Sequence, residues 1–517
     1  MTAQIPIEAR SFDRALAARR FAIGLLLSVL VYRAVLFAAA GWKAIHYPWE
    51  LDYGEGIVWQ QMRWMFTSRA YGPIDGFPAI VFHYPPLYHA VTAIAAAALG
   101  TDQLATGRAV SLLSTVAAGV ASAILVSIIL EGRASRSERR LCSSIAALLV
   151  FTYLPVAMWA TLMRVDMLAV ALGLFGLIAA IRSLERPALI YLASLLFVAA
   201  VFTKQTEIAP AVATFAVLLI ARPKLAARGI ATCLILGTIV LLALCWLTHG
   251  GFYRHIFLYN INRLEFARLV WVAYVPAAQA IYLPVAGFVL FRRLAEFRSK
   301  YRRNRNARSE LAASPGDIRL LVVAAYLLIS TFMLVLIAKS GSSINYFLDW
   351  FFAVGLFAAM APSEVDTAFR KMPDLRTMLG VGVCACLAIG AFSVPPPWPG
   401  DGADSPHARQ LARLAREIAS TQKPVISDDM VLVIRGGRDV VWESAIFAEL
   451  ASTGRWDERP FIQRIRNRQF AFFITLDDEG HRSFRQRYNP AVAEAMNAAY
   501  PVREKIAGLV VHRPRMR

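Results

Sequence analysis

Many apolar runs of about 20 residues constrain this chain more strongly than any other feature of its sequence. A helix needs about 20 apolar residues to cross the roughly 30 Å hydrocarbon layer of a bilayer. Of the 517 residues, 57% are hydrophobic and only 17% are charged. The pattern therefore predicts a polytopic α-helical membrane protein with about 11 transmembrane helices. The expected spans are 21–41, 108–130, 141–161, 166–181, 188–203, 207–221, 229–248, 269–291, 318–338, 346–361 and 376–394.

The basic residues indicate how these spans are oriented. The formal net charge is +20, and most of the surplus lies in short loops between apolar runs, which is typical of cytoplasmic loops rather than of a nucleic-acid surface. We therefore expect a cytoplasmic N-terminus (1–20), a C-terminal region outside the cytoplasm and no nucleic-acid partner. The basic residues that then fall inside are Arg10, Arg14, Arg19 and Arg20; Arg182 and Arg186; Arg222, Lys224 and Arg228; the run 291–308; and Arg370, Lys371 and Arg376.

The apolar stretch 86–99 is too short to cross a bilayer comfortably. If both this stretch and 108–130 crossed, the basic segment 131–140 would lie outside, whereas it lies inside if only 108–130 crosses. We therefore expect 86–99 to be a re-entrant or interfacial helix. It would belong to a long first outer loop, 42–107, of a transmembrane domain that extends over 21–394.

The first outer loop is acidic in a chain that is otherwise rich in base. After Glu55, apolar residues recur at i, i+4, i+7 and i+8, which predicts an amphipathic helix lying on the membrane surface. We expect its carboxylates to face the water. The acidic residues of 46–89 are Glu50, Asp52, Glu55 and Asp75, and the apolar positions are Val58, Met62, Met65 and Phe66.

Asp52 and Glu55 are the candidate catalytic residues. They are three positions apart, so a helical turn would place both carboxylates on one face. One of them could remove a proton from an acceptor hydroxyl while the other orients the acceptor. The alternative is that they only cap the amphipathic helix, because acidic side chains favour a helix N-terminus.

Other polar residues are expected at the outer ends of further spans, on the same membrane face as the acidic loop. Arg164, Lys204 and Lys339 would suit a phosphate group, Arg through a bidentate fork and Lys as a point charge. The alternative is that each only extends its charged end to the membrane surface. The remaining candidate substrate-binding residues are His83, Tyr84, Asp166, Gln205, Asn345 and Tyr346.

The sequence shows no dedicated metal site. All five cysteines lie in apolar runs, so neither a disulfide framework nor a cysteine metal site is implied. Asp428 and Asp429 are adjacent but have no further ligand nearby, which favours a turn at the end of a strand. We expect no cofactor, and a divalent metal is the alternative.

The composition changes abruptly after the last span. The segment SVPPPWPGDGADSP is typical of a stiff linker, which we place at 395–403. The apolar runs PVISDD, MVLVI, FAFFITL and LVVHR then alternate with polar helical stretches. We expect 404–517 to form a small extracytoplasmic α/β domain that shapes acceptor binding and contributes no catalytic group.

Several motifs together resemble the membrane glycosyltransferases of the GT-C superfamily. The motifs are ELDYGEG, YPPLY, GRAVSLLS, MRVDMLA, FTKQTEIAP and AKSGSSINYFLDW. The similarity is greatest to the bacterial branch of protein mannosyltransferases, aminoarabinose transferases and rhizobial galacturonosyltransferases, over roughly residues 15–360. Relatives commonly carry adjacent Asp and Glu where this chain has Gly54 before Glu55. Many also have a Lys before the Pro-Pro pair, where this chain has His83 and Tyr84.

The resemblance implies an inverting glycosyltransferase of the bacterial cytoplasmic (inner) membrane. Its donor would be a polyprenyl-phosphate sugar, and its acceptor a hydroxyl of a glycan, lipid or protein. Asp52 would be the general base with Glu55 as partner or substitute, and basic residues would hold the donor phosphate. One alternative is a flippase or exporter of a lipid-linked glycan, which predicts ionisable residues deep within the spans and repeated halves. Another is a membrane-anchored binding protein.

Overall fold

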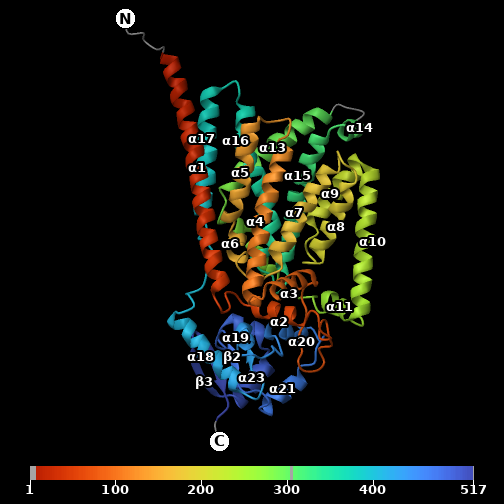
Figure 1. Ribbon diagram of the computed structural model, residues 1–517, viewed down its shortest axis with the longest axis vertical. Helices are drawn as coiled ribbons and strands as arrows, with labels where there is room; N and C mark the ends of the chain where they lie inside the picture. The colour runs from red at the N-terminus through yellow and green to blue at the C-terminus, as the bar shows by residue number, and fades with distance from the viewer. Residues whose placement is uncertain (1–6, 303–306, 516–517) are drawn as a thin grey trace.

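The computed structural model describes residues 7–302 and 307–515. It consists of a helical bundle and, at one end of the bundle, a smaller domain made by the C-terminal part of the chain (Figure 1). The beginning of α1 (Ile7–His46) and α14 (Ala307–Ala312) lie at the opposite end of the bundle. Two of the predictions fall partly outside the described residues, namely 1–6 of the N-terminal segment and 303–306 of the basic run.

Long apolar helices confirm that this is a multi-pass membrane protein. Within the described residues, six helices are long and apolar enough to cross a membrane, or seven if a bent pair counts as one span. That pair, Phe266–Ala277 and Tyr282–Tyr301, is bent by 87°. Three of the six are the helices α4 (Gln103–Ile129), α10 (Pro223–Leu247) and α17 (Pro373–Phe392). The other three are Ala17–His46, which is part of α1 (Ile7–His46); Pro315–Ala338, which begins with α15 (Pro315–Met333); and Ile344–Ala368, which ends with α16 (Leu348–Ala368).

Shorter helices occupy four of the other expected spans. Helices α8 (Leu189–Val201) and α9 (Ala209–Ala221) have 13 residues each, about 20 Å at 1.5 Å per residue. The expected span 141–161 is broken, because Pro155 begins a new short helix. These helices lie beside the long ones in the bundle (Figure 1). The bounds are α5 (Arg136–Leu149), a 3₁₀ turn (Val150–Thr152), α6 (Leu154–Trp159), α7 (Asp166–Arg182), α12 (Val270–Ala277) and α13 (Tyr282–Tyr301).

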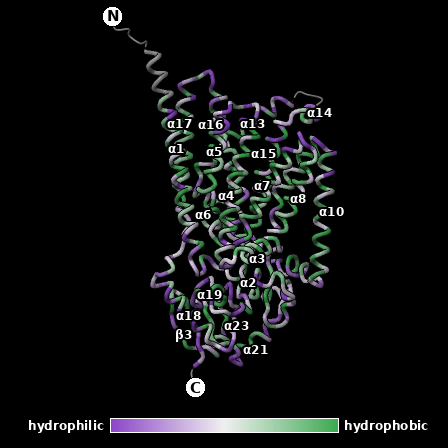
Figure 2. The backbone as a smooth tube through the Cα atoms, in the orientation of Figure 1, coloured by the Kyte–Doolittle hydropathy of each residue, from purple (hydrophilic) through white to green (hydrophobic). Residues whose placement is uncertain are grey.

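Apolar side chains cover the outside of the bundle as well as its interior. Figure 2 shows hydrophobic residues along most of α10, and none of the apolar window of this helix is buried. Leu234, Leu242 and Trp246 are more than half exposed. A helix that is apolar towards its surroundings is expected where those surroundings are lipid.

The C-terminal region forms the expected small α/β domain. Its four-stranded sheet has the order β1-β2-β4-β3, with β1 and β2 parallel and the other neighbours antiparallel. The strands are β1 (Ile426–Ser427), β2 (Phe473–Thr475), β3 (Val502–Ile506) and β4 (Leu509–Arg513), and the helices are α18 (Pro406–Ser420), α19 (Met430–Arg435), α20 (Ser444–Ser452), α21 (Arg459–Arg466), α22 (Arg482–Arg487) and α23 (Pro490–Ala499).

One apolar run of this domain is a helix and not a strand. The run MVLVI lies in α19, where the Asp429 carboxylate accepts a hydrogen bond from the Leu432 N–H at 3.1 Å and so caps the helix. Its apolar side chains are buried on all sides. When every residue of an apolar run is buried, the run shows neither the alternation of a strand nor the periodicity of an amphipathic helix. Its sequence therefore does not distinguish the two.

The first outer loop and the C-terminal domain share their hydrophobic cores. In one core Ile57, Val58 and Met62 of α2 (Glu55–Trp64) pack with Met430 and Val431 of α19. A Cβ atom on Gly56 would lie 2.5 Å from the backbone nitrogen of Val431, so the two helices approach closely. The loop and the domain therefore form one packed unit.

The expectation of a surface helix with carboxylates facing water is therefore wrong for α2. Its apolar face meets the C-terminal domain instead of lipid, and Glu55 is completely buried. The apolar stretch that follows forms α3 (Leu87–Leu99), which packs against α2 and α4. Its 13 residues are consistent with the expected short helix that does not cross the membrane.

Candidate active site

Asp52 lies in the turn that precedes α2. Its Oδ2 is 3.1 Å from Nη2 of Arg164, which also donates to the Tyr53 carbonyl oxygen. The Asp52 side chain is 47% exposed, so one carboxylate is held in place and still open to a substrate. Burial raises the pKa of Asp52 above the ordinary value, and the positive charge of Arg164 opposes this rise.

Gly54 explains how the turn accommodates Arg164. Its φ is +94°, a conformation that favours glycine. A Cβ atom at this position would lie 2.8 Å from Nη2 of Arg164. The glycine that separates Asp52 from Glu55 therefore leaves room for the guanidinium group that holds Asp52.

Glu55 has a different environment from Asp52. It is fully buried, and Arg108 of α4 binds both of its oxygens, Nε to Oε1 at 2.9 Å and Nη2 to Oε2 at 2.7 Å. The backbone N–H groups of Met163 and Leu51 donate to the same two oxygens, each at 2.8 Å. Burial acts to raise the pKa of Glu55, but Arg108 outweighs it and holds the pKa below the ordinary value. The two carboxylates do not share an open face.

Arg108 links three segments of the chain through hydrogen bonds. It is not among the candidate residues predicted from the sequence. Besides Glu55, it donates to the carbonyl oxygens of Ala44, Tyr47 and Trp49 at 2.8, 2.5 and 2.7 Å. It therefore joins α4 to the end of α1 and to the first loop. A single arginine in the otherwise apolar motif GRAVSLLS was the signal that could have identified it.

A second group of candidate residues lies where α7, the α8–α9 connection and the 3₁₀ helix before α16 (Ile344–Phe347) meet. Nζ of Lys204 is 2.8 Å from Oδ1 of Asp166, and Nδ2 of Asn345 donates to the same oxygen at 2.7 Å. Lys204 also lies 5.3 Å from the centre of the Tyr346 ring. The structure thus brings these four predicted residues into direct contact.

Tyr84 is close enough to both groups to feel their charges. Burial raises its pKa to about 12, and the charges of Arg164, Asp166 and Lys204 act on it as well.

His83 and Gln205 meet at the boundary with the C-terminal domain. Nε2 of His83 is 2.7 Å from Oε2 of Glu443, the residue before α20. The His83 carbonyl oxygen accepts hydrogen bonds from Gln205 at 3.0 Å and from Asn260 at 2.9 Å. Glu443 was missed because no local pattern connects it to a residue 360 positions earlier.

Lys339 is not in contact with the other candidates. It lies just after a short 3₁₀ helix (Leu334–Ala338), and its backbone bridges to Leu264. Burial lowers its pKa, which the charge of Glu449 opposes. Among the residues that the structure describes, its ammonium group has no hydrogen bond or ion pair.

Asp428 and Asp429 of the C-terminal domain each accept hydrogen bonds from the protein. No group of three or more His, Cys, Asp or Glu side chains within 7–302 and 307–515 could hold a metal ion. Asp429 caps α19, and Asp428 accepts hydrogen bonds from Ser444 at 2.6 Å, Tyr488 at 3.0 Å and the Leu476 N–H at 3.0 Å. These contacts fit a turn at the end of a strand.

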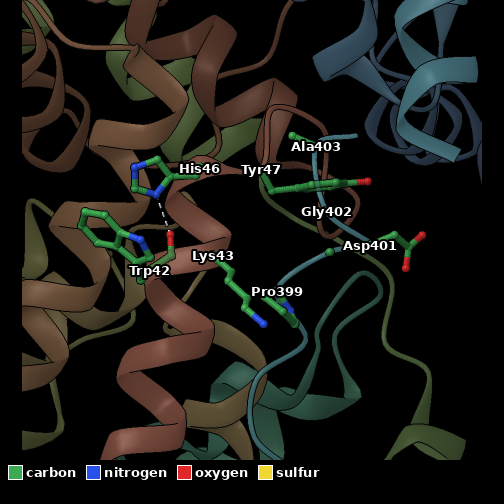
Figure 3. Close-up of a pocket in the computed structure, with 9 residues that line it drawn as sticks. Trp42, Lys43, His46, Tyr47, Pro399, Asp401, Gly402 and Ala403 are labelled. Carbon is green, nitrogen blue, oxygen red and sulfur yellow. Dashed lines mark hydrogen bonds between the residues drawn. The ribbon is translucent and has the colours of Figure 1, made fainter. Parts of the chain in front are cut away.

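A cavity of about 380 Å³ lies away from these residues, between the last turn of α1 and the linker (Figure 3). In this cavity Nδ1 of His46 is 2.8 Å from the Trp42 carbonyl oxygen. None of the candidate residues lines the cavity. Its walls include Trp42, Lys43, His46, Tyr47, Pro399 and Asp401.

Comparison with known proteins shows the class of fold. No protein-family model and no curated protein sequence matches the chain. Solved structures show instead that it has the fold of the GT-C membrane glycosyltransferases over most of its length. One of these structures is ArnT from Cupriavidus metallidurans bound to undecaprenyl phosphate, with a TM-score of 0.55 and 14% identity over 95% of this chain and 98% of that one.

The second similar structure is the oligosaccharyltransferase of Archaeoglobus fulgidus in its apo form. Its TM-score is 0.52, with 12% identity over 87% of this chain and 69% of that one. The first similarity includes the C-terminal domain, because it extends over nearly the whole of both chains. The expected resemblance is thereby confirmed at the level of the fold.

Proposed function

We propose that this protein is an inverting glycosyltransferase that moves a sugar from a polyprenyl-phosphate donor to an acceptor hydroxyl. The observation that carries the proposal is the half-exposed Asp52 carboxylate held by Arg164, which lies near the Asp166 that pairs with the buried Lys204. A base and phosphate-binding charges are the groups that such a displacement needs. The shared fold with ArnT, whose structure holds undecaprenyl phosphate, supports a polyprenyl-phosphate donor.

In the proposed reaction the ionised Asp52 takes the proton of the acceptor hydroxyl. The hydroxyl oxygen attacks the anomeric carbon, and the bond from that carbon to the phosphate oxygen breaks. The electron pair leaves with the polyprenyl phosphate, whose charge Arg164, Lys204 and Lys339 would stabilise. A single displacement inverts the configuration at the anomeric carbon.

The other residues would position the substrates. Glu55 with Arg108 would hold the first loop in place, so we assign Glu55 a structural part and Asp52 the base. Asp166 and Asn345 would orient Lys204, with which they are in contact. The remaining proposed contacts to the donor sugar or phosphate come from His83, Tyr84, Gln205 and Tyr346.

The proposed donor can be tested directly with the purified protein. Incubation with a panel of radiolabelled polyprenyl-phosphate sugars should release sugar from at least one donor, to an acceptor or slowly to water. The matched control is the same sugar on a nucleoside diphosphate, which should not react. A protein that moves the intact lipid-linked sugar between leaflets without cleaving it would instead be a flippase, and the proposal would fail.

We further propose that the short helices complete 11 spans, with the site on the outer face of a bacterial cytoplasmic membrane. A reporter that is active only outside the cytoplasm should be active when fused after residue 398 and silent when fused near residue 300. The same reporter fused to a known cytoplasmic protein gives the background signal. The reverse pattern would place Asp52 on the wrong side for this function.

A further inference from the structure

Arg487, the last residue of α22, is a partly buried cation that stacks on an aromatic ring. Its guanidinium carbon lies 4.3 Å from the centre of the Tyr53 ring. Its Nη1 is buried and has no hydrogen-bond partner in the part of the chain that the structure describes. Burying a charged nitrogen without a partner is costly. The free nitrogen therefore points to a group that binds there.

The nearby buried carboxylate does not account for Arg487. Asp428 acts on Arg487 through its charge, but its oxygens already accept hydrogen bonds from Ser444, Tyr488 and the Leu476 N–H. No ion pair to Arg487 occurs among the described residues, whereas Arg164 and Arg108 each have one. Arg487 is thus a guanidinium group beside the Asp52–Tyr53 turn that forms no ion pair with the described residues and leaves Nη1 without a hydrogen-bond partner among them.

The C-terminal domain holds Arg487 firmly against the first loop. Arg435 forms two hydrogen bonds with Asp102, at 2.5 and 3.0 Å, and His83 pairs with Glu443 at 2.7 Å. These contacts and the shared cores fix α22 relative to Asp52. The charge of Arg487 acts on the Asp52 carboxylate in the same sense as that of Arg164.

Two further arginines of α22 lie on the surface beyond Arg487. The Arg482 side chain is 74% exposed, and its Nη2 lies 3.6 Å from Oε2 of Glu265. Arg485 is also exposed. Positive charge therefore extends from the water-exposed side of α22 to the candidate base. A surface of one sign attracts ligands of the opposite sign.

We propose that Arg487 binds a phosphate or carboxylate group of the acceptor, next to the hydroxyl that Asp52 deprotonates. The planar guanidinium fork matches both anions. This inference rests on the proposed function, which supplies the acceptor, and names its chemical class as an anionic glycan or glycolipid. It also gives the C-terminal domain an acceptor-binding residue in addition to its packing role.

The test measures binding and does not depend on turnover. The probes are methyl glucoside 6-phosphate and methyl glucuronide, with neutral methyl glucoside as the reference, and the protein is the full chain in nanodiscs. The wild type should bind each anionic probe about tenfold more tightly than the neutral one. Arg487→Gln should lose this preference, and Arg487→Lys should keep part of it.

The matched control is Arg485→Gln, because Arg485 lies on the same helix and is exposed. This variant should keep the preference for the anionic probes. Equal binding of all probes by the wild type would overturn the inference, and so would the same loss in both glutamine variants, which would indicate general surface charge. Arg487→Gln also removes the contact with the Tyr53 ring, so its melting temperature is measured beside that of the wild type to separate loss of binding from loss of folding.

A kinetic measurement separates this inference from the proposed function. If the donor assay shows turnover, Arg487→Gln should leave donor hydrolysis to water unchanged and weaken only the use of an anionic acceptor. A loss of donor binding would assign Arg487 to the donor phosphate and overturn the inference. If the wild type shows no donor turnover, the proposed function fails while the binding result still tests Arg487.

Discussion

Replacing Asp52 by Asn should reduce sugar transfer by about 10²- to 10⁴-fold, the range typical of a lost general base. The amide cannot take the acceptor proton, yet it has the size of the carboxyl group and can still contact Arg164. Donor binding should therefore change little, and the fold should remain intact. The measurement is the transfer rate in membranes at saturating donor, with equal protein amounts.

Asp75→Asn is the matched control, because Asp75 is an exposed aspartate of the same loop. It should retain wild-type transfer. Full activity of Asp52→Asn would remove Asp52 from the mechanism.

The pH dependence of transfer follows from the same assignment. Only the ionised Asp52 can accept a proton, and burial raises its pKa above the ordinary value of 3.8. Transfer should therefore fall on the acid side, at a pH above the one expected for an exposed aspartate. An acid limb that stays unchanged in an active Asp52→Glu variant would assign it to another group.

Replacing Glu55 by Gln should mainly destabilise the protein. The change removes the carboxylate that pairs with Arg108, which is itself fully buried. Breaking a buried ion pair by removing one partner costs about 3–5 kcal/mol, because the other charge stays buried. The expected result is a clear drop in melting temperature, with loss of activity in proportion to the loss of folded protein.

Glu131→Gln provides the control for Glu55→Gln. Glu131 is 42% exposed and pairs with Arg182, which is 38% exposed, and with the buried Arg319, which keeps Glu185 as a second partner in this variant. Exposed ion pairs contribute only about 0–1 kcal/mol, so this variant should melt close to the wild type. A Glu55→Gln protein that melts normally but no longer transfers sugar would return Glu55 to the catalytic pair.

The different environments of Asp52 and Glu55 show which property of the site could not be predicted from the sequence. Their spacing of three predicted a shared helical face, but Asp52 precedes the helix and only Glu55 lies in it. Arg108 and Arg164, from two different segments, then bind one carboxylate each. Which of two nearby acids is open to a substrate depends on such partners, and the partners are not encoded in the local spacing.

The same limit explains the errors in the fold. The apolar face of α2 was assigned to the membrane surface because lipid and protein are equally apolar partners for such a face. In the structure α19 covers it, although the two helices lie more than 360 residues apart in the chain. Glu443 and Arg487 likewise lie near the first outer loop because the C-terminal domain packs against it.

The sequence by itself determined the membrane class, the position of the longest spans, the α/β character of the C-terminal domain and the expectation that Asp166, Lys204, Asn345 and Tyr346 lie at one end of the bundle. These follow from the length of apolar runs and the placement of charge, which are local properties. Only the tertiary structure decided that Glu55 is buried against Arg108 and that the C-terminal domain packs beside the Asp52–Tyr53 turn. Both depend on contacts between segments far apart in the chain, where burial and pairing set the state of each charge.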